Sequence, residues 1–153
     1  MCLRIKFNTK LKTAKIDLYV IKFLRQDYKG NIYSYYRSFK YNINKKYSLS
    51  PHLYNTYFKH KVLFVDHGFH SICSPKTEWG DVFDESELTF ICKIPKGSKY
   101  YLGNKGDIVS NKLIFVEKAW EYSKYTSCGW VNSSYVFKKS FKILEQKYGK
   151  QNY

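Results

Sequence analysis

The chain has 153 residues, of which 44% are hydrophobic and 20% aromatic, more than a disordered protein carries. Its length predicts one domain around a single core, and its apolar runs are far too short to cross a bilayer. Because 27 Lys and Arg outnumber 12 Asp and Glu, the net charge is +15. A chain this basic repels itself when compact, so we expect an anionic partner. Because the apolar runs are short, we expect no membrane association.

The first half of the chain is dominated by strand signals. Tyr, Ile, Val, Phe and Thr are common and Ala occurs twice, which favours strands over helices. Gly30 and Asn31 mark a turn between two strands, which we expect to form an antiparallel hairpin. In chain order, the patterns predict an edge strand at 3–7, a mostly apolar buried strand at 17–24, a turn at 26–31, an alternating strand at 32–41 and a loop at 42–60.

The second half continues as short strands and turns, followed by an ambiguous C-terminus. The patterns predict strands at 62–65 and 69–73 around a bulge at Gly68, an acidic surface loop at 74–86, strands at 88–94, 99–102 and 108–116, and turns at 95–98 and 103–107. Ser133 or Ser134 could cap a helix that ends at Gly149, or residues 135–143 could form an edge strand; we favour the helix. We expect residues 150–153 to fray.

The fold class expected from these elements is α+β. The prediction is a single domain over residues 1–149, with a mostly antiparallel sheet and one or two short helices. The N-terminus has no apolar signal region, so we expect the protein in the cytoplasm of its cell.

The positive charge is concentrated in two segments. Residues 1–63 hold 14 Lys and Arg against two acids, which gives +12, and residues 93–153 hold 12 Lys against four acids, which gives +8. Tyr and Phe are threaded through both, a mixture that suits nucleic acid or an acidic protein surface, although Tyr can equally pack its ring in the core. The candidate binding residues are Arg37, Lys40, Lys45, Lys46, Lys59, Lys61, Tyr35, Tyr36, Tyr41, Tyr47 and Tyr57.

A metal site is a second hypothesis. Zinc binds neutral His and thiolate side chains, and four such groups are candidates for a tetrahedral site: His67, His70, Cys73 and Cys92. The alternative is that these cysteines are small core residues. The four cysteines of the chain are widely and irregularly spaced, so we expect reduced thiols and no disulfide framework.

Catalytic signals are sparse. Cys2 would become an N-terminal nucleophile if Met1 were removed, or it is an ordinary residue beside an edge strand. The chain has no nucleophile elbow, no phosphate-binding loop and no dinucleotide fingerprint, so we expect no cofactor.

Several motifs resemble those of small proteins encoded by tailed phages and prophages, a family without an established activity. The resemblance lies in the opening Met1-Cys2-Leu3 with Thr13-Ala14-Lys15, and in the runs GFHS (68–71), CKIPKGSKYYLG (92–103) and SNKL (110–113). It covers about half of the chain. The resemblance implies a phage origin and the cytoplasm of an infected bacterial host.

A looser similarity is to the core of ADP-ribosyltransferases. Arg25, Ser71 and the turn at 94–97 occur in the order of that family's strand Arg, Ser motif and Pro-Lys-Gly-like turn, and His70 precedes Ser71. Ser110-Asn111-Lys112 stands where the family's catalytic Glu is expected. The resemblance therefore implies a fold that binds a nucleotide without transferring it.

Three functional hypotheses follow. The one we favour is a non-enzymatic phage accessory protein that binds and inhibits a host defence complex, for example a nucleic-acid-guided nuclease, through its basic, Tyr-rich surface; its partner would be an anionic protein or ribonucleoprotein, or nucleic acid directly. The second is a nucleotide-binding enzyme with an ADP-ribosyltransferase-like cleft. The third is a virion or assembly component.

Overall fold

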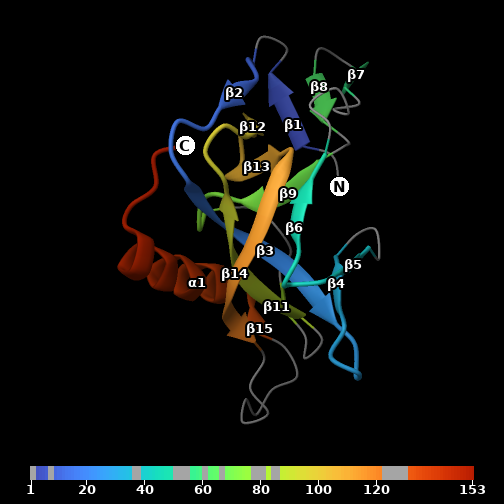
Figure 1. Cartoon of the computed structure of the whole chain (residues 1–153), viewed down its shortest axis with the longest axis vertical. Helices are drawn as coiled ribbons and strands as arrows, with labels where there is room; N and C mark the ends of the chain where they lie inside the picture. Colours follow the sequence, from blue (N-terminus) through green and yellow to red (C-terminus); the bar gives the residue numbers. More distant parts are fainter. Residues whose placement is uncertain are drawn as a thin grey trace.

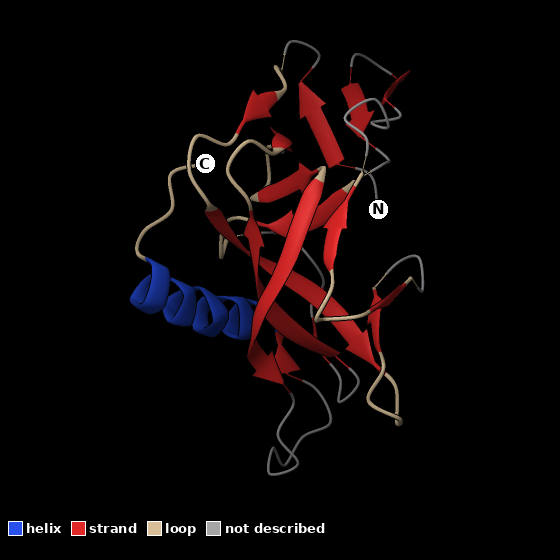
Figure 2. Cartoon of the chain, in the orientation of Figure 1, coloured by secondary structure: helices blue, strands red, loops and turns tan. Residues whose placement is uncertain are grey.

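The computed structural model (Figure 1) describes residues 3–6, 9–35, 39–49, 56–59, 62–65, 68–76, 82–83, 87–121 and 131–153. Its elements are β1 (Leu3–Lys6), β2 (Lys12–Thr13), β3 (Leu18–Gln26), β4 (Ile32–Ser34), β5 (Lys40–Tyr41), β6 (Lys46–Ser48), β7 (Thr56–Lys59), β8 (Val62–Val65), β9 (Phe69–Ile72), β10 (Val82–Phe83), β11 (Glu87–Ile94), β12 (Lys99–Leu102), β13 (Asp107–Ser110), β14 (Lys112–Glu121), β15 (Val131–Asn132) and α1 (Ser133–Tyr148). Strands dominate and one helix lies to the side (Figure 2), so the expected α+β class is confirmed.

The main sheet is built around three long central strands. Within the described residues its order is β2-β12-β13-β9-β3-β11-β14-β6, with β4 and β5 continuing from β3, and all its pairs are antiparallel. β3 pairs with β11 along its length, from Leu18↔Ile94 to Arg25↔Glu87. Two smaller sheets, β1-β8-β7 and β10-β15, complete the described strands.

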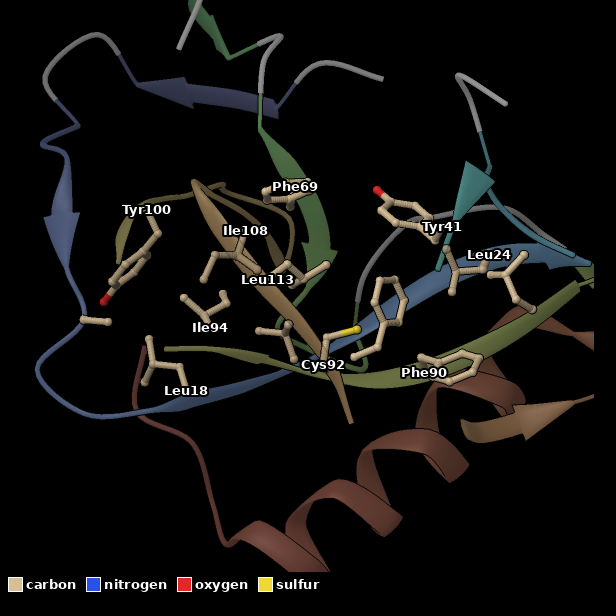
Figure 3. Close-up of a cluster of buried hydrophobic side chains, with 14 of the residues drawn as sticks. Leu18, Leu24, Tyr41, Phe69, Phe90, Cys92, Ile94, Tyr100, Ile108 and Leu113 are labelled. Carbon is tan, nitrogen blue, oxygen red and sulfur yellow. The ribbon is translucent and has the colours of Figure 1, made fainter. Parts of the chain in front are cut away.

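The two faces of β3 are covered by different parts of the protein. Leu18, Val20 and Leu24 face an interior cluster that includes Cys92, while Ile21 and Phe23 pack under α1. Figure 3 shows the interior cluster on the side of β3 and β11 that faces away from the helix. Because both faces are buried, β3 has an almost continuous apolar sequence.

Helix α1 begins and ends as the sequence indicates. The Asn132 side chain accepts a hydrogen bond from the Ser134 N–H (2.9 Å), so the cap lies one residue before the expected serines. The helix ends at Gly149, whose φ of 75° favours glycine. Its buried face includes Val136, Phe137, Phe141 and Leu144, and it packs on Ile21, Phe23, Ile72 and Ile91. No helix of the described residues is long and apolar enough to cross a membrane.

Three expectations about strands need correction. The alternating run at 32–41 is divided into β4 and β5, which pair with each other, because the chain folds back between them. The expected loop at 42–60 contains β6 and β7, and the acidic loop at 74–86 contains β10. These strands have two to four residues; β6 and β10 pair with strands far away in the chain, whereas β7 pairs with the adjacent β8. Such pairs leave little local signal.

The expected strand at 108–116 is interrupted at Asn111. This residue is 3% exposed, and its side chain accepts a hydrogen bond from the Lys99 N–H (2.8 Å). The interruption satisfies a buried polar group and separates β13 from β14.

The C-terminal tail is held in place, which contradicts the expected fraying of 150–153. The Gln151 side chain accepts a hydrogen bond from the Tyr19 N–H (2.9 Å), and the Tyr153 hydroxyl donates to the Tyr19 carbonyl (2.5 Å). Tyr148 stacks on the Tyr19 ring with centroids 4.0 Å apart. The tail therefore extends the contact between α1 and the start of β3.

Candidate functional site

The structure gathers part of the predicted binding set on one short segment. Residues 39–49, here called the basic segment, comprise Phe39, β5, a turn and β6. Lys40, Lys45 and Lys46 are exposed on it. Phe39 is 51% exposed and Ile43 41% exposed, so apolar side chains lie among the lysines.

The turn and the strand pairing hold the basic segment in shape. The Lys45 N–H donates to the Asn42 carbonyl (3.0 Å), and the Asn42 N–H donates to the Tyr47 hydroxyl (2.7 Å). β6 pairs with β14, with Lys112 opposite Ser48. Lys46 is two residues before Ser48, so Lys112 and Lys46 are diagonal neighbours across the paired strands. Such neighbours share a face and lie within about 8 Å of each other. Exposed Lys112 therefore extends the positive surface beside Lys46. Sequence analysis missed Lys112, since no local pattern connects it to a strand more than sixty residues earlier.

Tyr41 and Tyr47 anchor the basic segment and do not present open stacking surfaces. Tyr41 is 8% exposed, and its ring centroid lies 5.2 Å from that of Tyr47 and 5.0 Å from that of Phe115. Figure 3 shows Tyr41 at the edge of the interior cluster. Phe39, with its centroid 5.0 Å from that of Tyr41, is the exposed ring at this position, and it was absent from the predicted set.

Tyr35 is the one other predicted binding residue whose side chain the structure describes, and it lies elsewhere. Tyr35 stacks on Phe23 with centroids 4.4 Å apart, under the Arg25 guanidinium, and therefore belongs to the helix-side cluster. Tyr36, Arg37 and Lys61 lie outside the described residues, as do the side chains of Tyr57 and Lys59.

The charge of the basic segment has no described counter-charge. The ion pairs among the described residues join Lys93 to Asp17, Lys118 to Glu121 and Lys147 to Glu117, on other parts of the protein. An unbalanced positive surface attracts anionic partners and accelerates their association.

A further lysine is buried directly behind the basic segment. Lys22 is 5% exposed, and its ammonium donates a hydrogen bond to the His70 carbonyl (2.6 Å) and lies 5.3 Å from the Tyr41 ring centroid. Burial lowers the pKa of Lys22 to about 8 and raises that of neighbouring Cys92 to about 12. Lys22 is an internal charge covered by Tyr41, and a partner on the surface would not reach it.

The predicted catalytic residues that the structure describes do not converge. His70 donates from Nε2 to the Val65 carbonyl (3.2 Å), and burial, with the Lys22 charge second, lowers its pKa to about 4. Ser71 is 1% exposed, and its hydroxyl has no hydrogen-bond partner among the described residues. Arg25 is exposed beside Tyr35. It lies four positions along β3, or about 13 Å, from Ile21, which pairs with the strand β9 that carries His70 and Ser71. Cys2 lies outside the described residues.

The predicted metal ligands that the structure describes form no metal site. Cys92 is fully buried opposite Val20 and Phe115, whereas Cys73 follows β9 and donates its N–H to the Gly106 carbonyl (2.8 Å). No group of three or more His, Cys, Asp or Glu side chains in the described part of the chain could hold a metal ion, and His67 lies outside that part. Cys73 and Cys92 are free thiols that pack as core or half-buried residues.

Comparisons of the chain with protein-family models, with curated proteins and with solved structures find no match. Inference about function therefore depends on the surface chemistry, which is strongest at the basic segment.

Proposed function

We propose that the protein is a phage-encoded accessory protein that binds and inhibits a host defence complex, such as a nucleic-acid-guided nuclease, without catalysis of its own. The observation that carries this proposal is the basic segment, which presents exposed Lys40, Lys45 and Lys46 together with exposed Phe39 and no described acid to neutralise them. The phage-like motifs supply the biological setting.

The mixed character of the segment favours a protein or ribonucleoprotein partner. Protein interfaces need an apolar centre within a polar rim, and Phe39 and Ile43 provide exposed apolar area on the same segment as the lysines. Charge complementarity then governs how fast and how selectively the partner associates. Occupation of a defence complex's nucleic-acid-binding surface by this segment would block access of its guide or target.

The segment is also well supported from beneath. Tyr41, Tyr47 and Phe115 pack under it, and β6 is paired with β14, so the lysines project from a fixed backbone. A preformed surface loses less conformational entropy on binding than a mobile loop does.

The test is a tagged pull-down from bacterial lysate, with and without nuclease, that compares the native chain with K40Q/K45Q/K46Q. We expect one dominant complex that survives nuclease treatment, is lost from the variant, and has its nuclease activity inhibited by the purified native protein. The matched control is K138Q/K139Q/K142Q, which removes the same charge from α1 and should still capture the complex.

Association of the purified pair should be measured as a function of salt. The basic-segment variant should associate roughly 10-fold or more slowly at low ionic strength. Capture that is insensitive to salt and to the variant, or capture of nucleic acid alone that disappears with nuclease, would contradict the proposal.

A further inference from the structure

A second positive surface lies on helix α1, on the opposite side of β3 from the interior cluster (Figure 3). Lys138, Lys139 and Lys142 are all exposed, and they lie on the face opposite buried Phe137 and Leu144. At 3.6 residues per turn these three lysines, here called the helix lysines, form one cluster on the solvent ridge.

The helix lysines have no acidic partner among the described residues. None of them takes part in an ion pair among the described residues, whereas Lys147 of the same helix binds Glu117. Lys138 and Lys142 are four residues apart on one face, where like charges destabilise a helix. The first turn holds no acidic residue, and Glu145 is the helix's sole acid. This arrangement of like charges destabilises the helix, and a bound anion would relieve the repulsion.

The ridge is too polar for a protein core contact or for insertion into a membrane. Tyr135, 52% exposed, is the one large apolar side chain that this fully described helix presents to solvent, and Lys139 lies over its ring at 5.4 Å from the centroid. An interfacial membrane helix would turn its apolar face outward, but α1 packs that face against the sheet. Lysines are also depleted from the centres of protein interfaces.

We propose that the helix lysines bind the phosphate backbone of a nucleic-acid duplex without reading its sequence. A rigid helix that carries three adjacent ammonium groups matches a polyanion whose charges repeat every few ångströms. A lysine ammonium binds a phosphate as a point charge. Contacts to the phosphates of the nucleic acid do not distinguish one base sequence from another. This site is independent of the proposed function, since it uses a different surface and different residues.

The test is a binding titration with a fluorescent DNA duplex of about 25 base pairs at salt concentrations between about 50 and 200 mM. Each lysine that neutralises a phosphate contributes about −0.9 to the slope of log K against log salt. K138Q/K139Q/K142Q should therefore bind with a slope that is smaller in magnitude by about 2 to 3. Gln has nearly the helix propensity of Lys, so circular dichroism should be unchanged, and the melting temperature should stay the same or rise slightly because the Lys138–Lys142 repulsion is removed.

Two further variants make the result specific. K40Q/K45Q/K46Q removes the same charge from the basic segment and should leave the slope nearly unchanged. K138R/K139R/K142R keeps the charge and should retain duplex binding.

Three results would overturn the proposal. The first is an unchanged slope in K138Q/K139Q/K142Q. The second is an equal loss of slope in K138Q/K139Q/K142Q and K40Q/K45Q/K46Q. The third is that K138Q/K139Q/K142Q loses binding to phosphatidylglycerol vesicles while its duplex binding persists. Loss of complex capture by the basic-segment variant alone would bear on the proposed function and not on this site.

Discussion

Replacement of buried Lys22 by Met should stabilise the protein at neutral pH. Met keeps the unbranched side chain and removes the ammonium that lies among Tyr41, Cys92 and the His70 carbonyl. The dominant effect of this environment is desolvation, which lowers the pKa of Lys22 from 10.5 to about 8. The folded protein therefore holds the proton less tightly than the unfolded chain does.

The magnitude follows from that pKa. The pKa of Lys22 falls from 10.5 to about 8 on folding, which corresponds to about 3 kcal/mol of destabilisation of the folded protein while Lys22 is charged. Loss of the hydrogen bond to the His70 carbonyl costs about 1 kcal/mol, so the net gain of Lys22→Met at pH 7 is about 2 kcal/mol. Because the unfolded chain binds more protons between pH 8 and 10.5, the native protein recovers stability as pH rises through that window. The stability difference should change by about 2.5 kcal/mol between pH 7 and pH 10, so near pH 10 the variant should have lost its advantage.

The assay is urea unfolding followed by tryptophan fluorescence, from pH 6 to pH 10 under reducing conditions. Burial raises the pKa of Tyr41 and of Cys92 and lowers that of His70, so in the folded protein these neighbours stay neutral across the window. Ionisation of Tyr and Cys in the unfolded chain affects both proteins equally and cancels in the difference. The control Lys112→Met removes an exposed ammonium and should change the free energy of unfolding by less than about 0.5 kcal/mol. A variant that is less stable at pH 7, or a difference that is constant with pH, would refute the reasoning.

Three further outcomes are expected in the same unfolding assay. Phe137→Ala removes a ring that is 1% exposed under α1 and should destabilise by about 3–5 kcal/mol; a loss below about 1 kcal/mol would mean that the helix is not anchored there. Gly106→Ala should be worse than Gly97→Ala, since both glycines have positive φ (78° and 83°) but only a Cβ at 106 would meet the Ser74 Cβ, at 2.7 Å; equal losses would contradict this. Tyr153→Phe should cost about 1 kcal/mol through its lost hydrogen bond, and no change would indicate an undocked tail.

Local patterns were enough to predict the kind of fold. The β-branched and aromatic run in β3, the turn at Gly30 and Asn31, and the apolar spacing of Val136, Phe137 and Leu144 each specify an element from its own residues. Short pairs such as β6 with β14 were not predicted, because three residues carry too little periodicity and the partner is remote.

The candidate binding surface was predicted in part. Lys40, Lys45 and Lys46 are close in sequence, so a local count of charge identifies them. Exposed Lys112 joins them only through strand pairing, and Tyr41 leaves the surface because strands far away in the chain bury its ring. The charge of a segment is local, whereas the exposure of a side chain depends on what packs over it.

The sequence by itself determined that this protein is basic, aromatic and strand-rich, and it favoured a helix over an edge strand at the C-terminus. Only the tertiary structure decided that Lys22 is an internal charge while the helix lysines and the basic segment lie on opposite sides of β3. The physical reason is that side chains alternate between the two faces of a strand. The position of a residue in the strand decides which face its side chain is on, but elements far away in the chain decide whether that face is buried.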